Sequence, residues 1–592
     1  MNVKQRITLF RNEMSKLGLN AWIIPSSDPH ASEYVTERWM GRKWISGFSG
    51  SAGTVVLLSD KAGLWTDGRY YIQAEEELRH SGIALFKDGL SETPSITDWL
   101  YSELSDGDKV GFDGEVFSYN FKNEVVSKFR QKNISVVSNQ DILEQTWKDR
   151  PQMTNSEIFE HPLKYAGKTR LEKLAEVRAE MEKNQVSHHF ISSLDDIAWL
   201  YNFRGMDMDT CPVALCYTLV SKNKAQLFIA PEKVPVELKK SFNNDSIQLC
   251  NYSDVMTEIA SIPDTARVLF DHKRINSTLA DLIPSSCHKQ DGISITTSLK
   301  AIKNSVEIEH FRACHIKDGA AVVKFLIWLD EHVPTGKVTE LDASAKLESY
   351  RREIDTNKGL SFTTIPGYGA NGAMMHYAST EESNCLIEQD NFFLVDSGGQ
   401  YFDGTTDITR TMSYGELSYE KKLDFTLVVK GHIQLAIARF MQGTRGVQLD
   451  MLARQPIWKH AINYACGTGH GVGFFLNVHE GPHNISLRFI DESLEPGMCV
   501  TNEPGIYRPG EHGIRIENIM LVVESEKNEF GNFFAFEQLT MCPIQTDSLL
   551  LDLMTFEEKE YLNQYHEKVF SKLSQVLNSK ESSWLKQATK AI

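Results

Sequence analysis

Two histidines stand nine residues apart in a glycine-rich part of this 592-residue chain, His470 within 467–473 and His479 within 477–482. Glycines on both sides of His470 allow the backbone to turn tightly and bring the imidazole close to a bulky group, which a metal ion would explain. One histidine does not hold a metal ion alone. The chain must therefore supply further ligands.

Four carboxylates complete a candidate ligand set, each beside a short extended stretch. Asp396 ends an apolar strand predicted over 391–399, and Asp407 begins the next extended run. Glu503 and Glu517 lie at or near the ends of two more short strands, predicted over 499–505 and 513–518. Singly, each has an ordinary alternative, such as a turn cap, a loop contact for Asp407 or pairing of Glu517 with Arg515.

Four carboxylates and one imidazole carry too much negative charge to be buried together without cations, since the carboxyl groups would otherwise be protonated. Two divalent metal ions meet this requirement. Oxygen-rich ligands with a single nitrogen favour a hard ion such as Mn2+, although they do not exclude Zn2+ or Co2+. Two ions about 3.5 Å apart would also hold a bridging hydroxide, because coordination lowers the pKa of water toward about 7. The set predicts metal-assisted hydrolysis.

The order Asp396, Asp407, His470, Glu503, Glu517, with its flanking motifs, resembles the metallopeptidase family with the pita-bread fold. Within that family the chain is similar to the long, three-domain, cytosolic-type Xaa-Pro aminopeptidases, also called aminopeptidases P. The similarity runs through the stretches 371–377, 403–411 and 475–482 and covers nearly the whole chain.

The resemblance implies an enzyme that releases the first residue of peptides whose second residue is proline. An Xaa-Pro bond is a tertiary amide without an N–H, so peptidases that grip an extended chain through its N–H groups lose a contact there. By the resemblance, Asp396 chelates one metal ion and His470 binds the other, while Asp407, Glu503 and Glu517 complete or bridge the pair. Glu503 is also the implied general base, which takes a proton from the attacking water.

The resemblance also implies a set of residues around the substrate. His376 and His479 would bind substrate and stabilise the tetrahedral intermediate or its leaving group. Tyr507 and Arg515 would line the far wall, although Arg515 could instead hold Glu517 in place. A histidine hydrogen-bonded within a loop is the ordinary alternative for His376 and His479.

Cys466 departs from the family pattern. Related aminopeptidases P commonly have a histidine at this position, four residues before the metal-binding histidine and near the proline side of the substrate. A thiol does not replace a protonatable imidazole. We therefore hypothesise weaker turnover or an altered preference after the scissile bond, with thiolate capture of soft metals such as zinc as a second risk. A tolerated substitution is the alternative.

Three other functions stay open at this stage. A prolidase-type dipeptidase would cut only Xaa-Pro dipeptides, whereas the long N-terminal region and the run 478–482 favour an aminopeptidase. A catalytically weakened pita-bread protein would act by binding, but such proteins usually lose metal ligands. The creatinase branch hydrolyses without metals, which the intact ligand set argues against.

Composition narrows the class further. With 41% hydrophobic and 24% charged residues, the chain is typical of a globular protein, and its length predicts about three domains. A formal charge of -17 without a basic cluster argues against nucleic acid and anionic membranes as partners. Neither a signal core nor a membrane-spanning run is present, so we expect a cytoplasmic protein whose nine cysteines are reduced thiols.

The N-terminal half reads as two copies of one α/β domain. Ile7, Phe10, Met14 and Leu17 share one helical face before a buried strand over 21–24, and the motifs of 13–50 recur over 180–205. The first copy has about a dozen extra residues, 30–42, most simply a surface loop or an arm reaching a neighbouring site.

The predicted fold is therefore α/β and α+β, with two related creatinase-like α/β domains before a pita-bread domain. We expect domains at 1–150, 151–302 and 303–592, the last opening with a helix from Ser305 and ending in a helical extension over about 530–592. A helix pair is predicted over 556–592. The resemblance implies a homodimer, and Trp458 lies in a segment similar to the dimer contact, with a core tryptophan as the alternative.

Overall fold

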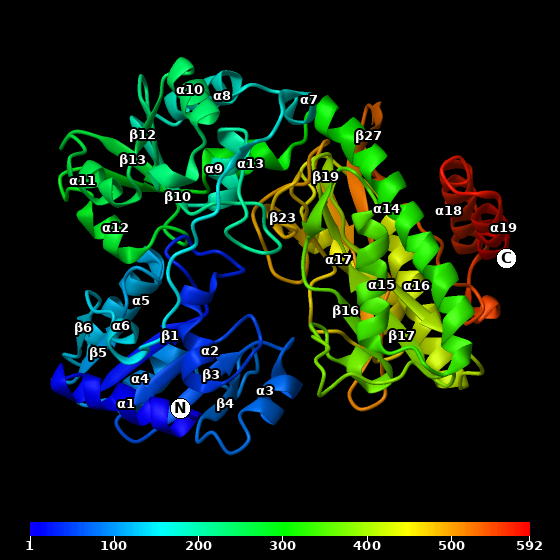
Figure 1. Cartoon of the computed structure of the whole chain (residues 1–592), viewed down its shortest axis with the longest axis horizontal. Helices are drawn as coiled ribbons and strands as arrows, with labels where there is room; N and C mark the ends of the chain where they lie inside the picture. The colour runs from blue at the N-terminus through cyan, green and yellow to red at the C-terminus, as the bar shows by residue number, and fades with distance from the viewer. The chain divides into compact units, whose positions relative to one another are not determined.

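The computed structural model describes residues 1–592, which divide into two compact units. The first contains Met1–Glu160, Lys168–Met208 and Val213–Thr296, and the second contains His161–Gly167, Asp209–Pro212 and Thr297–Ile592. Figure 1 labels their elements. No helix is both long and apolar enough to cross a bilayer. All nine cysteines are free thiols, as the sequence predicts.

The first unit has two six-stranded sheets with the same topology. One has the order β4-β3-β2-β1-β5-β6, formed by β1 (Ala21–Pro25), β2 (Thr54–Leu58), β3 (Ala62–Thr66), β4 (Ala84–Lys87), β5 (Lys109–Phe112) and β6 (Ser135–Val137). The other has the order β12-β11-β10-β8-β13-β14, formed by β8 (His188–Ile191), β10 (Cys216–Ser221), β11 (Ala225–Ile229), β12 (Ile247–Cys250), β13 (Arg267–Phe270) and β14 (His288–Asp291).

The two sheets also agree in strand direction. In each, the first strand pairs antiparallel with the second and parallel with the fifth. Each third strand pairs antiparallel with the second and parallel with the fourth. The prediction of two copies of one α/β domain is confirmed.

Helices surround these sheets in the usual α/β manner. They are α1 (Val3–Lys16), α2 (Gly41–Ser46), α3 (Tyr71–Glu77), α4 (Ile96–Glu103), α5 (Tyr119–Arg130), α6 (Ile142–Thr146), α8 (Arg170–Lys183), α9 (Leu194–Leu200), α10 (Val236–Asn244), α11 (Val255–Ala260) and α12 (Ser277–Leu282). A capping box between Asn2 and Gln5 begins α1, whose Ile7, Phe10 and Met14 are buried. Leu17 was wrongly assigned to this face: it follows the helix as its C-cap and is 37% exposed.

The extra residues of the first copy are not a plain surface loop. His30 is 1% exposed; its Nδ1 lies 3.0 Å from the Ser192 carbonyl oxygen, and its Nε2 lies 2.9 Å from the Tyr252 hydroxyl. Trp39 in the same insertion is also buried. The insertion therefore joins the two copies through buried polar contacts, because residues of the second copy satisfy both nitrogens of an imidazole in the first.

The second unit surrounds its strands with long helices, which Figure 1 shows beside β16 and β17. The helices are α14 (Ser305–His332), α15 (Glu340–Arg352), α16 (Tyr419–Ala436), α17 (Gly446–Trp458), α18 (Phe556–Leu573) and α19 (Ser579–Ala588). The predicted helix from Ser305 and the predicted C-terminal helix pair are both confirmed. The helical extension expected from about 530 begins only at Phe556, because residues 531–538 form a strand. Leu562, Val569 and Leu585 bury that pair in the core of the unit.

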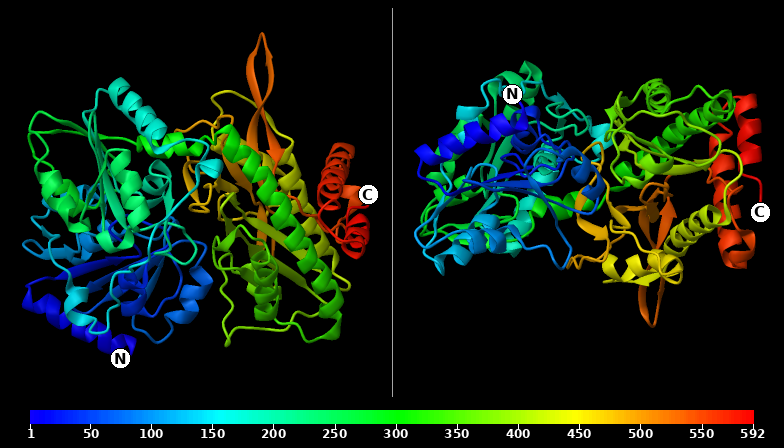
Figure 2. Two further views of the ribbon diagram at one scale, coloured as in Figure 1. Left: turned by 45° about the horizontal axis from the view of Figure 1, so that its top comes forward. Right: turned by 90° about the horizontal axis from the view of Figure 1, so that it is seen from below.

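Four sheets supply the strands of this unit. The largest has the order β21-β28-β27-β24-β22-β23, formed by β21 (Arg439–Met441), β22 (Gly469–Gly471), β23 (Glu480–Ile485), β24 (Cys499–Asn502), β27 (Asn518–Asn528) and β28 (Gly531–Gln538). The others are β16 (Ile365–Tyr368) with β17 (Phe392–Ser397) and β20 (Ile408–Ser413), β15 (Asn357–Leu360) with β18 (Gly399–Tyr401) and β19 (Gly404–Thr405), and β25 (Gly505–Arg508) with β26 (His512–Arg515). Figure 2 shows the hairpin of β27 and β28 projecting from the unit.

Three buried histidines predict a loss of stability in mild acid. Burial lowers the pKa of His189, His483 and His566 from 6.5 to about 4. Between these values the unfolded chain binds protons that the folded chain does not, so stability is full above pH 6.5 and falls toward pH 4. Each histidine contributes up to about 1.4 kcal/mol per pH unit in this window.

The measurement is the urea midpoint of unfolding at pH 7, 6 and 5, with His566→Gln as the test variant. His566 Nε2 accepts a hydrogen bond from the Ile544 N–H at 3.2 Å, which a glutamine oxygen can replace. The variant should show a shallower decline in the midpoint with acidification. An unchanged slope would contradict the assignment of a neutral His566.

Candidate metal centre

The five predicted ligands come from strand ends in different sheets of the second unit. Asp396 lies in β17, and Asp407 directly precedes its neighbour β20. His470 is the middle residue of β22, and Glu503 directly follows β24. Glu517 stands between β26 and β27. Each ligand is thus at or beside the end of a short strand, as the sequence predicts.

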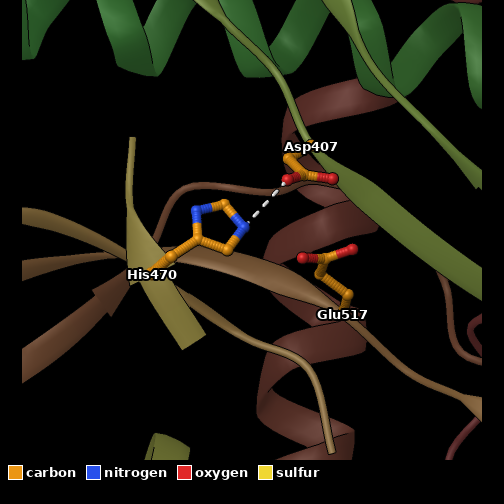
Figure 3. Close-up of side chains that lie close together, drawn as sticks. All are labelled: Asp407, His470 and Glu517. Carbon is orange, nitrogen blue, oxygen red and sulfur yellow. Dashed lines mark ion pairs between the residues drawn. The ribbon is translucent and has the colours of Figure 1, made fainter. Parts of the chain in front are cut away.

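Three of these side chains form a compact cluster. Asp407, His470 and Glu517 each offer a ligand atom, and these atoms all lie within 4.8 Å of one another (Figure 3). The dashed line in Figure 3 marks the ion pair of His470 Nε2 with Asp407 Oδ2, whose atoms are 3.4 Å apart. His470 Nε2 also lies 3.7 Å from Glu503 Oε1.

The His470 ring is oriented by its own strand. Its Nδ1 lies 2.8 Å from the Gly471 carbonyl oxygen, to which it donates, so the other nitrogen faces the carboxylates. Burial opposes protonation of this imidazole, but Asp407 and Glu503 outweigh burial and raise its pKa to about 9. The position of Nε2 is therefore one in which the surrounding charge favours a cation.

The pKa shifts of the carboxyl groups also indicate a site that favours a cation. Burial raises the pKa of Asp396, and the charge of Asp407 adds to this, against the opposing effect of Arg515. Burial and neighbouring carboxylates likewise raise the pKa of Glu503 and place that of Glu517 well above its usual value. Asp396 Oδ1 is buried without a hydrogen-bond partner. Only positive charge would relieve this concentration of buried anions.

The donor set fits two divalent metal ions. It offers eight carboxylate oxygens and one free imidazole nitrogen, which is the composition preferred by hard or borderline ions. The unpartnered Asp396 Oδ1 is an available ligand atom, and the hydrogen bond from His470 to Gly471 leaves Nε2 available. The fit rests on the orphaned Asp396 Oδ1, on the direction of His470 Nε2 toward the carboxylates and on the charge of the cluster.

Thr409 supports the ligands but was not selected from the sequence. Its hydroxyl donates to Glu517 Oε2 at 2.8 Å and accepts from Arg515 Nε at 3.1 Å. Thr409 is fully buried on β20, two residues after Asp407. The sequence could have indicated Thr409, because Asp407, Thr409 and Thr411 alternate along one strand and alternate residues share a face.

Replacing Thr409 by valine is expected to weaken metal binding by about 10- to 100-fold, the usual cost of losing a group that orients a ligand. Valine keeps the shape but releases Glu517 and removes an acceptor for Arg515. Competition with a chromogenic chelator gives the apparent Kd. Thr411→Val is the matched control, because Thr411 donates to the Arg515 carbonyl oxygen at 2.9 Å and touches no ligand carboxylate. Equal affinities in both variants would contradict this role.

Arg515 binds Asp396. The alternative raised from the sequence, that Arg515 holds Glu517 in place, is wrong. Its Nη2 donates to Asp396 Oδ2 at 2.6 Å, and its Nη1 donates to the Tyr507 hydroxyl at 2.6 Å. The structure therefore places Arg515 and Tyr507 together beside the carboxylate cluster. Their chain of contacts continues to Cys466, whose thiol interacts with Tyr507.

Cys466 is held as a neutral thiol. Burial, together with the charge of Glu503, raises its pKa to about 11. The thiolate that would capture a soft metal is therefore a minor species at neutral pH. Because a bound soft metal would itself deprotonate the thiol, zinc capture and an altered substrate preference both stay predictions.

The two predicted substrate histidines lie on separate loops. The His479 ring is 4.3 Å from the His470 ring and nearly perpendicular to it. His376 lies in the loop 369–385, where the carbonyl oxygen of its neighbour Met375 is 3.4 Å from Arg515 Nη2. One loop thus reaches the candidate ligand His470, and the other reaches Arg515, which binds Asp396.

Known protein families match nearly the whole chain in successive segments. Residues 6–145 and 149–307 each match the creatinase/prolidase N-terminal domain, 309–524 match metallopeptidase family M24, and 532–592 match the C-terminal region of that peptidase family. A probable Xaa-Pro aminopeptidase P of Coprinopsis cinerea is 38% identical over 100% of this chain and 99% of its own length. Aminopeptidase P2 of Arabidopsis thaliana is 39% identical over 100% of this chain and 89% of its own.

A solved structure is similar over the full length. The X-prolyl aminopeptidase of Caenorhabditis elegans, described as a cytosolic enzyme with a di-nuclear active site, has a TM-score of 0.96 at 32% identity and covers 100% of both chains. A buried carboxylate cluster on this scaffold defines a pita-bread metallopeptidase. The chain belongs to metallopeptidase family M24, with two creatinase-type domains before the peptidase domain.

Proposed function

We propose that this protein is a metal-dependent aminopeptidase that hydrolyses the bond between an N-terminal residue and a following proline. The observation that carries the proposal is the buried cluster of Asp407, His470 and Glu517, in a chain that matches Xaa-Pro aminopeptidases from end to end. Asp396 and Glu503 complete the proposed ligand set. Two divalent ions held there would lower the pKa of a water molecule and polarise the peptide carbonyl.

Glu503 is the proposed general base. Its side chain is 20% exposed, against 11% for Asp396 and 5% for Asp407, so it is the carboxylate most open to substrate. Its backbone N–H donates to the Thr468 carbonyl oxygen at 2.7 Å, which fixes the turn after β24. A fixed, accessible carboxylate is suited to accept a proton from water and return it to the leaving nitrogen.

The remaining roles surround that step. His376 and His479 would bind the substrate and donate hydrogen bonds to the oxygen that gains charge. Arg515 orients Asp396 and opposes the rise in its pKa, and Tyr507 and Cys466 would form the wall nearby. The proposed domains remain 1–150, 151–302 and 303–592.

Mn2+ is the proposed metal, because oxygen ligands dominate the set. A cytoplasmic location accords with the free thiols and with the cytosolic relative. Homodimerisation is supported by Trp458, which is 39% exposed and so is not a core tryptophan. Light scattering at several concentrations would test the dimer.

The test of the proposed function uses protein stripped with a chelator and an Xaa-Pro-Pro tripeptide. Release of the first amino acid should be absent without metal and restored by Mn2+. An Xaa-Pro dipeptide in the same assay separates an aminopeptidase from a prolidase, which would prefer the dipeptide. Folded protein that binds metal but releases no amino acid would instead point to a binding role.

Cys466→His tests the departure from the family pattern. A histidine there would supply a protonatable group, and we expect kcat on Xaa-Pro-Pro substrates to rise by about 10²-fold, the lower end of the range for proton-transfer assistance. Cys466→Ser is the control, because it changes the thiol without adding an imidazole. Unchanged kinetics of the histidine variant on all Xaa-Pro peptides would reject the hypothesis.

A further inference from the structure

A buried carboxylate that is not one of the candidate metal ligands binds the loop that carries His376. Glu340 is the first residue of α15 and is fully buried. Its side chain points away from the helix into the loop 369–385, where it meets hydrogen-bond donors only. The N-terminal end of a helix favours a negative charge at this position.

Several hydrogen bonds converge on Glu340 from that loop and its entry strand. Oε1 accepts from the Tyr368 N–H at 2.8 Å and from Asn371 Nδ2 at 3.0 Å. Oε2 accepts from the Tyr377 hydroxyl at 2.8 Å and from the Ser379 hydroxyl at 3.3 Å. The donors stand on both sides of His376. Such convergence fixes a loop, because each bond restricts a different part of its backbone.

The far end of the loop is attached to the same helix terminus. The Glu340 N–H donates to the Cys385 carbonyl oxygen at 3.1 Å, and the Leu341 N–H donates to Asn384 Oδ1 at 3.1 Å. On the opposite side, Arg515 Nη2 lies 3.4 Å from the Met375 carbonyl oxygen. His376 therefore stands between an anchor at Glu340 and a contact from the arginine that binds Asp396.

We propose that Glu340 is a positioning residue that holds the loop 369–385, and with it His376, against the metal centre. That Glu340 holds the loop rests on the hydrogen bonds alone. The effect of Glu340 on catalysis rests on the proposed function. Burial raises the pKa of Tyr377 to about 12, so its hydroxyl keeps the proton that it donates to Glu340. Removing the carboxylate takes away the one acceptor that donors on both sides of His376 share.

The main experiment compares Glu340→Ala with Glu382→Ala. The control removes the same charge from an exposed position of the same loop. Amide hydrogen exchange over 369–385 should become at least tenfold faster in Glu340→Ala and stay unchanged in Glu382→Ala. Metal stoichiometry should be unchanged in both, because the ligands lie on other strands. Ser379→Ala removes one donor to Glu340 and leaves the carboxylate in place, so it should shift exchange in the same direction by a few-fold, should Glu340→Ala fail to fold.

The kinetic readout separates positioning from general stability. Glu340→Ala should lower kcat/KM for the tripeptide by about 10- to 100-fold, mainly through kcat, as expected when a group acting in the transition state is displaced. If Glu340 acts through His376, then adding Glu340→Ala to His376→Ala should cause no further loss.

Additive losses in the double variant, or unchanged exchange in folded Glu340→Ala, would overturn the proposal. The two levels of inference fail separately. A wild-type protein that cleaves no Xaa-Pro peptide with any divalent metal would refute the proposed function, and the exchange data would still decide whether Glu340 anchors the loop.

Discussion

Replacing Glu503 by glutamine is expected to lower kcat on an Xaa-Pro-Pro tripeptide by about 10²- to 10⁴-fold, the range found when a general base is removed. Glutamine has nearly the same shape but does not accept a proton from water. It also removes one negative charge from a buried cluster in which carboxylates raise the pKa of one another. Weaker binding of one metal ion should accompany the loss of rate.

The measurement is steady-state kinetics at saturating Mn2+, with metal content determined on the same samples. Saturating metal separates the loss of the base from the loss of a ligand, because only the second is recovered by added metal. Glu511→Gln is the control: Glu511 is exposed in the turn between β25 and β26 and should leave kcat unchanged. A Glu503→Gln variant within tenfold of wild type at full metal occupancy would remove Glu503 from the role of base.

Replacing Arg410 by methionine is expected to lower the free energy of unfolding by about 3–5 kcal/mol, because it leaves several buried acceptors unpaired. Arg410 is 2% exposed. Its guanidinium donates to the Glu517 carbonyl oxygen at 2.7 Å, to the Cys542 carbonyl oxygen at 2.8 Å and to Asn518 Oδ1 at 2.9 Å. It thereby joins the strand after Asp407 to the segment of Glu517.

The same substitution should weaken metal binding, since it frees the backbone of a ligand. Urea unfolding followed by circular dichroism measures the stability, and chelator competition measures the metal affinity. Arg439→Met is the control, because the Arg439 side chain is 61% exposed and forms only a 3.3 Å ion pair with Glu526, typically worth less than about 1 kcal/mol. A similar change in both variants would show that Arg410 has no special structural role.

The sequence was sufficient to select the five candidate ligands, because each one has a local signature. Asp396, Asp407, Glu503 and Glu517 stand beside short extended stretches, and glycines flank His470. Chain order and strand ends are properties that neighbouring residues determine. The repeated α/β domain was also detectable, because corresponding motifs recur at similar spacing in two segments of one chain.

Errors arose where burial depends on distant partners. Leu17 follows the apolar period of its helix but lies beyond the helix end and is exposed. The insertion containing His30 reads as a surface loop, yet Ser192 and Tyr252 of the second copy bury it. Periodicity describes one element, whereas these outcomes depend on which other elements pack against it.

The sequence by itself determined the family of the fold, the five candidate ligands and their demand for cations, since charge, order and strand pattern are written in the chain. Only the tertiary structure decided how those ligands are held. Thr409 meets Glu517 across 108 residues, and Arg515 meets Asp396 across 119. The burial that keeps Cys466 protonated and the convergence of a loop on Glu340 likewise depend on segments that become neighbours only when the hydrophobic core brings the strands together.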